Sequence, residues 1–326
     1  RMKPLLYVLL AIVLLLALAF LLGPRERVRT AIGFRPADLG ADPAAALAAS
    51  EARFGDILAG QAKEIVWRDT AAPARTGWAV VYVHGFSASK AEIRPVPDRI
   101  AAALGANLFY TRLAGHGRTG AAMAEAEAGD WLDDVAEALE VGRRIGEKVI
   151  VIATSTGATA AAHHAVTGDH MAGVGALIFV SPNFGVRSKA AAALTLPWAR
   201  RLLPLAFGRE RDTGAESPEV GRHWQTRYPT VALLPMAALV KHVAAEDHGR
   251  AGTPLLVFHS PDDKVVDPAA TRRVFDRWGG PKRWIDVPGA AGPSHHVIAG
   301  DIMSPATTDE VVDAALDWLD ATAGAR

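Results

Sequence analysis

The sequence predicts an α/β fold in which a mostly parallel sheet carries helices on both faces. From Glu64 onward, short runs rich in β-branched residues alternate with longer amphipathic segments, a pattern typical of strand–helix–strand units. Several of the short runs are apolar throughout, as expected for parallel strands that are covered on both sides. Because strand–helix–strand crossovers are right-handed, we expect the helices to cover both faces of one sheet.

The alternating pattern defines the expected elements in order. The expected strands span residues 64–68, 78–83, 107–111, 148–153, 176–180, 254–259 and 283–287. The expected helices span residues 91–104, 130–145, 157–167, 269–278 and 309–319, and an earlier helix is expected around residues 43–59.

Composition narrows the possible partners. The chain has 326 residues, 50% of them hydrophobic, which suffices for one large core with an inserted segment. Lys plus Arg (35) balance Asp plus Glu (35), so no net charge draws the chain toward a polyanion, and we expect no nucleic-acid partner. The absence of cysteine excludes disulfides, thiolate metal sites and a cysteine nucleophile.

An unbroken apolar run, residues 5–22, predicts a membrane-spanning helix. As a helix it would be about 27 Å long, enough to cross the bilayer core. A cleaved signal peptide has a shorter apolar region followed by a small-x-small site, whereas this run ends in Gly23-Pro24-Arg25. We therefore expect an uncleaved, single-pass anchor that localises the protein to a membrane. Basic residues stand on both sides of the run, so the positive-inside rule does not choose a side.

These patterns predict the domain organisation. About seventy residues separate the strands expected at 176–180 and 254–259, too many for a simple crossover, so an inserted cap is expected between them. In order, we expect a membrane anchor (residues 1–24), a juxtamembrane connection (25–62), the first part of the core (63–184), a helical cap (185–252) and the second part of the core (253–326).

A β-branched run ends abruptly on a serine that is flanked by small residues. Residues 149–152 lead into Ala153-Thr154-Ser155-Thr156-Gly157, which fits the nucleophile-elbow frame G-x-S-x-G except that Ala replaces the first Gly. The outer positions of an elbow need small side chains so that the strand end and the helix start can approach closely, and Ala meets this need. Taken alone, the string also fits a helix N-cap.

Ser155 has candidate partners after later strands. In a parallel sheet, chemistry gathers at the carboxyl ends of the strands, where Asp263 and His296 also lie. Serine hydrolysis needs a hydroxyl nucleophile, a base that accepts its proton and a carboxylate that orients the base. The chain order Ser155, Asp263, His296 supplies all three.

Four motifs follow expected strands and match one family pattern together. They are an oxyanion loop (His84-Gly85-Phe86), a Gly-His-Gly loop (Gly115-His116-Gly117), an acid motif (Ser260-Pro261-Asp262-Asp263-Lys264-Val265-Val266) and a base motif (Ser294-His295-His296-Val297-Ile298). With these motifs the sequence resembles the α/β-hydrolase superfamily, and within it the carboxylesterase and monoacylglycerol-lipase-like group, also labelled serine aminopeptidase S33 or Hydrolase_4. The resemblance covers about residues 78–319 and implies an α/β-hydrolase fold. Ala153 and Ser260 replace two family glycines.

Each candidate in the triad has a neighbour of the same chemistry. The elbow frame selects Ser155 over Thr154 and Thr156, because only the central position projects its side chain from the turn.

The family frames make the other two choices. The acid motif selects Asp263 over Asp262 and Asp267, and Asp267 is expected to cap the next helix. The base motif selects His296 over His295.

An oxyanion hole is expected from two backbone N–H groups, those of Phe86 and Thr156. His84 and His116 are expected to brace these loops by hydrogen bonding rather than to catalyse.

No metal and no cofactor are expected. The chain has no His-Glu-x-x-His motif, no carboxylate cluster with ligand spacing and no phosphate-cradling glycine loop. His163 and His164 follow the elbow at too great a distance to reach the reacting atom, and adjacent helical residues do not share a face.

The sequence therefore predicts a serine hydrolase that cleaves carboxylic esters, as a carboxylesterase or a lipase-like enzyme, through an acyl-enzyme. Ser155 would attack the carbonyl, His296 would transfer the proton and Asp263 would orient His296. The expected cap has two apolar clusters separated by a polar stretch, residues 209–222. An apolar roof with no cluster of charges over the site favours a hydrophobic acyl group over a charged peptide, and so a small-molecule or lipid ester as the substrate.

Two other functions remain open at this point. An aminopeptidase or amidase on the same triad would need an acidic or carbonyl-rich pocket for a free amino terminus, for which Glu92, Glu216 and Glu219 are candidates. A catalytically silent, membrane-tethered binding module is the other alternative, and the complete triad argues against it.

Overall fold

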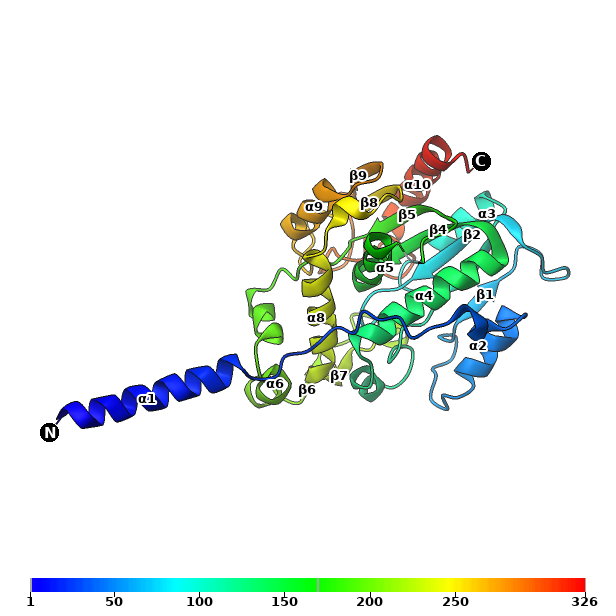
Figure 1. The fold of residues 1–326 in the computed structure, drawn as a ribbon. Coiled ribbons are helices and arrows are strands. Elements are labelled where there is room, and N and C mark those ends of the chain that lie inside the picture. Colours follow the sequence, from blue (N-terminus) through cyan, green and yellow to red (C-terminus); the bar gives the residue numbers. More distant parts are fainter. Residues whose placement is uncertain (1, 169, 326) are drawn as a thin grey trace.

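A seven-stranded sheet forms the centre of the protein (Figure 1). The computed structural model describes residues 2–168 and 170–325. The strand order is β1-β3-β2-β4-β5-β8-β9; β1 is antiparallel to β3, and all other neighbouring pairs are parallel. The predicted mostly parallel sheet is thus confirmed. Its strands are β1 (Glu64–Val66), β2 (Thr76–Val83), β3 (Asn107–Tyr110), β4 (Gly146–Thr154), β5 (Val174–Val180), β8 (Leu255–His259) and β9 (Lys282–Asp286).

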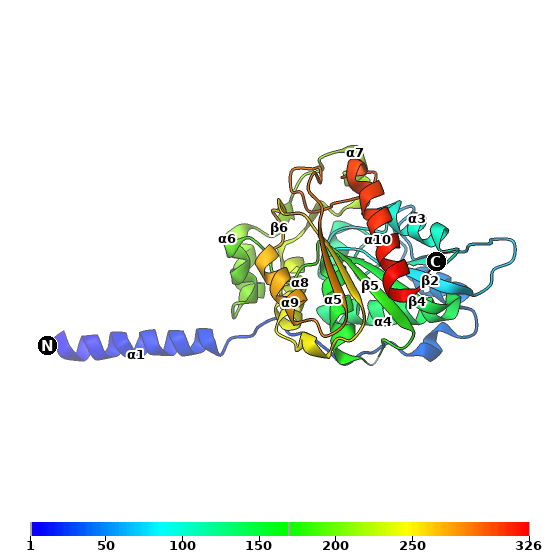
Figure 2. The same cartoon turned by 90° about the horizontal axis from the view of Figure 1, so that it is seen from above.

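Helices cover both faces of this sheet (Figure 2). Along β2, Val81 and Val83 belong to one hydrophobic core, and Val80 and Tyr82 belong to the other. Because successive side chains of a strand point to opposite faces, one apolar run fills two cores. One face carries α4 (Ala128–Ile145), α5 (Ser155–Thr167), α8 (Leu233–Ala244) and α9 (Pro268–Arg277), and the other carries α3 (Val96–Ala103) and α10 (Thr308–Ala323).

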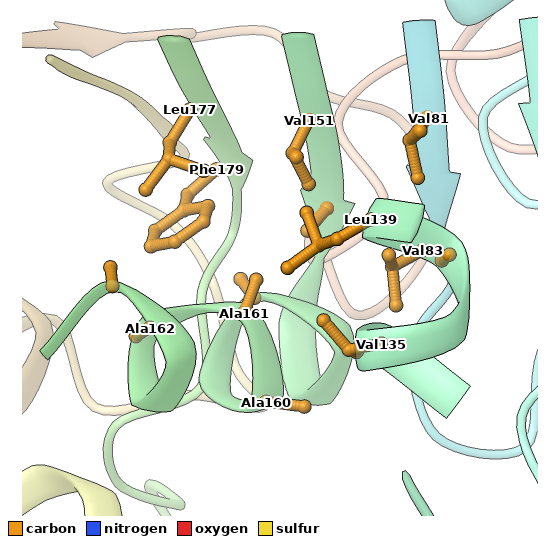
Figure 3. Packing of buried hydrophobic residues seen from close by; sticks show 14 of the residues in the cluster. Val81, Val83, Val135, Leu139, Val151, Ala160, Ala161, Ala162, Leu177 and Phe179 are labelled. Carbon is orange, nitrogen blue, oxygen red and sulfur yellow. The ribbon is translucent and has the colours of Figure 1, made fainter. Parts of the chain in front are cut away.

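Helix α5 lies against the sheet through alanines (Figure 3). Ala161 and Ala162 are buried in the same core as Val151 of β4 and Phe179 of β5. Alanine side chains let the helix backbone approach the strands closely, and the larger side chains of the sheet fill the space between them. This packing holds the first residue of α5, Ser155, at the end of β4.

Two predicted helices are shorter than expected. The helix expected at 91–104 begins only at Val96, because Pro95 at its N-cap lacks an N–H and disfavours a helical conformation of the residue before it. The helix expected at 43–59 is α2 (Pro43–Glu51), and the chain turns at Ala52 and Arg53.

The segment between β5 and β8 contains more than helices. It holds α6 (Ala199–Phe207), α7 (Pro218–His223) and α8, together with an antiparallel pair of short strands, β6 (Glu210–Asp212) and β7 (Arg227–Pro229), that the sequence did not predict. Leu239 and Val243 of α8 are buried in the main core with α5. We therefore infer that the expected cap, residues 185–252, joins the body through α8.

The N-terminal helix α1 (Met2–Leu21) projects away from the body (Figure 1). Its window Pro4–Leu21 has a mean hydropathy of 2.9 over 18 residues, and none of that window is buried. Length and composition therefore suit a membrane span, and the same features also suit a signal sequence.

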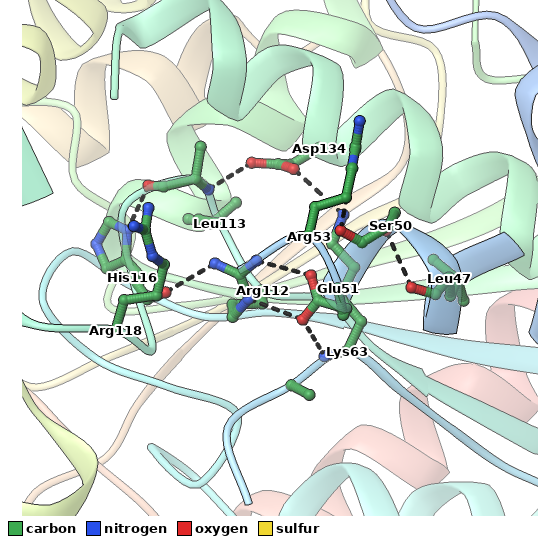
Figure 4. A network of polar contacts seen from close by, with 12 residues as sticks. Leu47, Ser50, Glu51, Arg53, Lys63, Arg112, Leu113, His116, Arg118 and Asp134 are labelled. Carbon is green, nitrogen blue, oxygen red and sulfur yellow. Dashed lines mark hydrogen bonds and ion pairs between the residues drawn. The ribbon is translucent and has the colours of Figure 1, made fainter. Parts of the chain in front are cut away.

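The expected juxtamembrane connection packs on the body. Leu39 and Leu47 are buried in the main core. Glu51 forms a buried, two-pronged ion pair with Arg112: Nε donates to Oε2 over 2.8 Å and Nη2 donates to Oε1 over 2.7 Å (Figure 4). Burial alone would raise the pKa of Glu51, but the hydrogen bonds and charge of Arg112 outweigh it and lower the pKa. The Glu51–Arg112 ion pair thus anchors residues 25–62 to the core.

Replacing Glu51 by Ala should strongly destabilise the fold. The substitution leaves the buried Arg112 guanidinium without its carboxylate, and breaking a buried pair in this way costs about 3–5 kcal/mol of unfolding free energy. Equilibrium urea unfolding of the full chain in detergent micelles measures this. Asp38→Ala, which breaks the exposed pair Asp38–Arg35, is the control and should change stability little. Equal effects of the two substitutions would contradict the role given to Glu51.

Candidate active site

The turn from β4 into α5 is sharp and presents Ser155 at the carboxyl end of the sheet. Ser155 has φ 49°, an uncommon conformation for a residue with a side chain. A Cβ on Gly157 would lie 2.6 Å from the carbonyl oxygen of Val83 and 2.5 Å from that of His84, so this position requires glycine. Ala153 is fully buried in the main core, and its methyl group is accommodated there. The missing first glycine of the elbow frame therefore does not prevent the turn.

The fold brings Ser155, His296 and Asp263 into one chain of hydrogen bonds. Nε2 of His296 lies 3.0 Å from Oγ of Ser155, and Nδ1 of His296 lies 2.7 Å from Oδ2 of Asp263. Asp263 follows β8 and His296 follows β9, so three separate strand ends supply the three side chains. All three residues are buried, and Asp263 has no exposed surface.

Asp263 is held as a carboxylate. Burial by itself would raise its pKa, but the hydrogen bond and charge of His296 outweigh burial and lower the pKa. The backbone N–H groups of Val265 and Val266 also donate to Oδ1, over 2.7 and 3.0 Å. These donors fix one carboxylate oxygen and leave Oδ2 aimed at the His296 ring.

Three of the residues that compete with the triad candidates in the sequence form other hydrogen bonds. The hydroxyl of Thr154 pairs with the Tyr82 hydroxyl at 3.1 Å, and Asp267 accepts from the N–H of Ala269 at the start of α9. Nδ1 of His295 lies 2.7 Å from the carbonyl oxygen of Ala290.

The loop after β2 lies directly beside Ser155. A Cβ on Gly85 would lie 3.1 Å from that of Ser155. The next residue, Phe86, lines the same cavity as Ser155 and Thr156. Thr156 is the second residue of α5, so its N–H has no acceptor within the helix. Phe86 and Thr156 thus both border the cavity in front of Ser155.

A buried glutamate holds this loop in place. Oε2 of Glu92 accepts from the N–H of Gly85 over 2.7 Å and from the Tyr82 hydroxyl over 2.9 Å. Burial raises the pKa of Glu92, and the two donors only partly oppose that shift. Sequence reasoning considered Glu92 only as a ligand for an amino terminus. Nothing in the local sequence signals its contact with Gly85, because the loop between them must fold back first.

Two histidines brace the loops as acceptors. Nε2 of His84 accepts from the N–H of Leu113 over 3.1 Å, and Nε2 of His116 accepts from the N–H of Ser87 over 2.9 Å. Both rings are buried, and burial lowers the pKa of His84 to about 3 and that of His116 to about 4. Both therefore stay neutral at neutral pH, which an accepting nitrogen requires.

The cavity in front of Ser155 has a volume of about 340 Å³. Part of its lining comes from the inserted segment, through Trp224, Tyr228, Leu233 and Met236. Tyr228 packs edge-on against the Phe86 ring, with ring centroids 5.5 Å apart. The cavity is therefore bounded by the core on one side and by the inserted segment on the other, where apolar residues stand together with the polar residues Arg211, Glu216 and Gln225.

The sheet, the elbow turn and the inserted segment define an α/β-hydrolase. The chain belongs to the Hydrolase_4 family, described as serine aminopeptidase, S33, whose model matches residues 74–291. That match includes Ser155 and Asp263 and ends before His296. No curated protein matches the chain in sequence.

Several solved structures share the fold. One is described with LipS and LipT, two metagenome-derived lipolytic enzymes (TM-score 0.61, 18% identity, 81% of this chain and 99% of that chain). Another is the monoacylglycerol lipase of Paleococcus ferrophilus (TM-score 0.57, 15% identity, 80% and 98%). A third is a soluble variant of monoglyceride lipase from Saccharomyces cerevisiae in complex with a substrate analog (TM-score 0.59, 15% identity, 80% and 91%). At these identities the similarity shows the fold alone.

The buried histidines should make stability fall in acid. A histidine in the unfolded chain has a pKa near 6.5, so it binds a proton below that pH. In the folded chain the pKa is about 3 for His84 and about 4 for His116, so both remain neutral at a pH where the unfolded chain is protonated. The free energy of unfolding contributed by these groups is present above pH 6.5 and is lost as the pH falls from there.

Comparing the wild type with His116→Gln measures this effect. Urea unfolding from about pH 7 to about pH 4.5 should show a shallower acid loss in the variant, because one group fewer takes up a proton on unfolding. Burial raises the pKa of Asp134 to about 6 and so acts in the opposite sense, but it does so equally in both proteins. Parallel pH profiles would contradict the assignment.

Proposed function

We propose that the chain is a serine hydrolase that cleaves carboxylic esters at Ser155. The observation that carries this proposal is the unbroken series of hydrogen bonds from Asp263 through His296 to the Ser155 hydroxyl. With Nδ1–H of His296 directed at Asp263, Nε2 is left to accept the proton of Ser155.

The reaction follows from these positions. Ser155 Oγ attacks the ester carbonyl while His296 Nε2 takes its proton, and the N–H groups of Phe86 and Thr156 stabilise the oxyanion. His296 then returns the proton to the leaving alkoxide, which leaves an acyl group on Ser155. A water molecule, activated by the same imidazole, releases the acid and restores the serine.

The lining of the cavity favours an ester over a peptide with a free amino terminus. An aminopeptidase needs a carboxylate directed at the amino group, and Glu92 has Oε2 committed to Gly85 and Tyr82. Glu219 pairs with Arg222 at 2.9 Å, and only Glu216 lines the cavity as an exposed carboxylate. The inserted segment adds apolar side chains to the cavity, among them Trp224, Leu233 and Met236, which suit a hydrophobic acyl group, and it also adds Arg211.

The proposal includes a membrane location. We infer that α1 crosses the bilayer, because an exposed helix with 18 consecutive apolar positions would otherwise present its whole surface to water. A membrane lipid or a small-molecule ester that partitions into lipid would then be the nearest substrate.

A fluorophosphonate probe tests the serine chemistry. The wild-type chain in detergent should be labelled, and Ser155→Ala should not be, because the probe reacts with an activated serine. Hydrolysis of p-nitrophenyl butyrate should fall by at least about 10⁴-fold in Ser155→Ala. Thr213→Ala, which removes another hydroxyl from the cavity lining without touching His296, is the matched control and should remain labelled. An unlabelled wild type, or equal labelling of Ser155→Ala, would refute the proposed function.

A further inference from the structure

A cluster of metal-ligating side chains lies away from Ser155, where α5 packs against α8. It consists of His163 on α5, His242 in the last turn of α8 and Glu246 just after that helix. One ligand atom from each residue lies within 4.8 Å of those from the other two. Both ribbon views show α5 and α8 side by side (Figures 1 and 2). We call these three residues the α5–α8 cluster.

Glu246 is the centre of the cluster. Its Oε1 lies 2.6 Å from Nδ1 of His163 and 3.4 Å from Nε2 of His242. In a tetrahedral zinc site, bonds of about 2.0–2.1 Å place neighbouring ligand atoms about 3.3 Å apart. A metal ion in place of the proton between Glu246 and His163 therefore needs these two atoms to separate by less than about 1 Å more.

One oxygen of this carboxylate has no donor. Oε2 of Glu246 is buried and makes no hydrogen bond within residues 2–168 and 170–325. The side chain of Glu246 is 14% exposed and that of His163 is 4% exposed. A buried carboxylate oxygen without a partner is costly, because it has lost its contact with water and gained nothing in return. A cation bound at the cluster would remove this cost.

The backbone around Glu246 is held in place. Arg277 of α9 donates from Nη2 to the carbonyl oxygen of Ala244 over 2.9 Å and from Nη1 to that of Glu246 over 3.5 Å. The N–H of Glu246 donates to the carbonyl oxygen of Val243 over 3.0 Å, which continues the helical turn. His242 and Glu246 are four residues apart on this turn, so their side chains lie on the same face. The ligands are thus oriented before an ion binds.

The donor set selects the kind of ion. Two imidazole nitrogens and one carboxylate oxygen suit zinc and related transition metals, whereas magnesium and calcium prefer oxygen ligands. The side chain of His242 is 41% exposed, so solvent reaches the position left for a fourth ligand. His163 lies about 12 Å along α5 from Ser155, so the ion would not touch the reacting atoms.

We propose that the α5–α8 cluster binds one zinc-like divalent transition-metal ion, which joins α8 to α5. Leu233 and Met236, at the start of α8, line the cavity in front of Ser155. An ion at the other end of α8 therefore stabilises the helix that supplies part of the cavity wall. The expectation of no metal rested on motifs within single stretches of chain, and this cluster joins two helices.

Metal binding is measured on the full chain in detergent, after a chelator has stripped it and any affinity tag has been removed. Isothermal titration calorimetry should show one saturable Zn²⁺ site per chain and no Mg²⁺ site. His242→Ala removes the exposed ligand and should weaken Zn²⁺ binding by at least about 100-fold, because loss of a residue that only orients a ligand already costs about 10–100-fold.

His223→Ala is the matched control. His223 and Glu219 have the same spacing and lie 3.9 Å apart, but no third ligand completes a cluster with them within residues 2–168 and 170–325. This variant should bind Zn²⁺ as the wild type does. A wild type without a saturable site, equal binding by His242→Ala, or Mg²⁺ bound as tightly as Zn²⁺ overturns the proposal.

Amide hydrogen exchange tests the link between the two helices. Zn²⁺ should slow exchange in the last turns of α8 in the wild type and not in His242→Ala, because the ion binds only the conformation in which α8 lies on α5. Zn²⁺ binding that leaves this exchange unchanged overturns the role given to the ion. Neither measurement uses ester hydrolysis, so both outcomes are independent of the proposed function.

Discussion

The turn at Ser155 is the constraint on which the rest of the site depends. A residue with a side chain at positive φ carries strain of about 1–3 kcal/mol and persists only where the surroundings hold it. Here β4 is buried between its neighbours, and α5 is packed on the sheet through alanines. Gly157 lets the helix start pass close to the end of β2. Because β4 and α5 are both anchored along their length, their packing offsets the backbone strain at Ser155.

A second constraint places the loop that faces the serine. Glu92 holds Gly85 from one side, and His116 accepts the N–H of Ser87 from the other. The loop of His116 is in turn held by Arg112, whose guanidinium donates to the His116 carbonyl oxygen over 2.9 Å and pairs with Glu51. The segment before β1 thus stabilises the expected oxyanion loop through buried polar contacts. This explains how residues that precede the family match at 74–291 still bear on the site.

The inserted segment performs two tasks at once. Its end, α8, is part of the main core, and Met236 near the start of α8 reaches the cavity in front of Ser155. Its beginning, α6, is joined to the exit of α1 through Trp198 and Arg200. The cavity is therefore bounded by one continuous piece of chain that is packed on the hydrolase core at one end and on the N-terminal helix at the other.

Local patterns in the chain sufficed for the sheet, the helices around it and the nomination of Ser155, whereas the choice of Asp263 and His296 over their neighbours came from the resemblance to the family motifs. Strand and helix periodicities are properties of neighbouring residues, and the motif order follows from the chain order of the strand ends. They did not reveal β6 and β7, which have only three residues each, or the late start of α3 after Pro95. Nor did they reveal the contacts of Glu92 and of Glu51. Such contacts join residues far apart in sequence or across a folded loop, and only the packing of the whole chain decides which buried charge meets which donor.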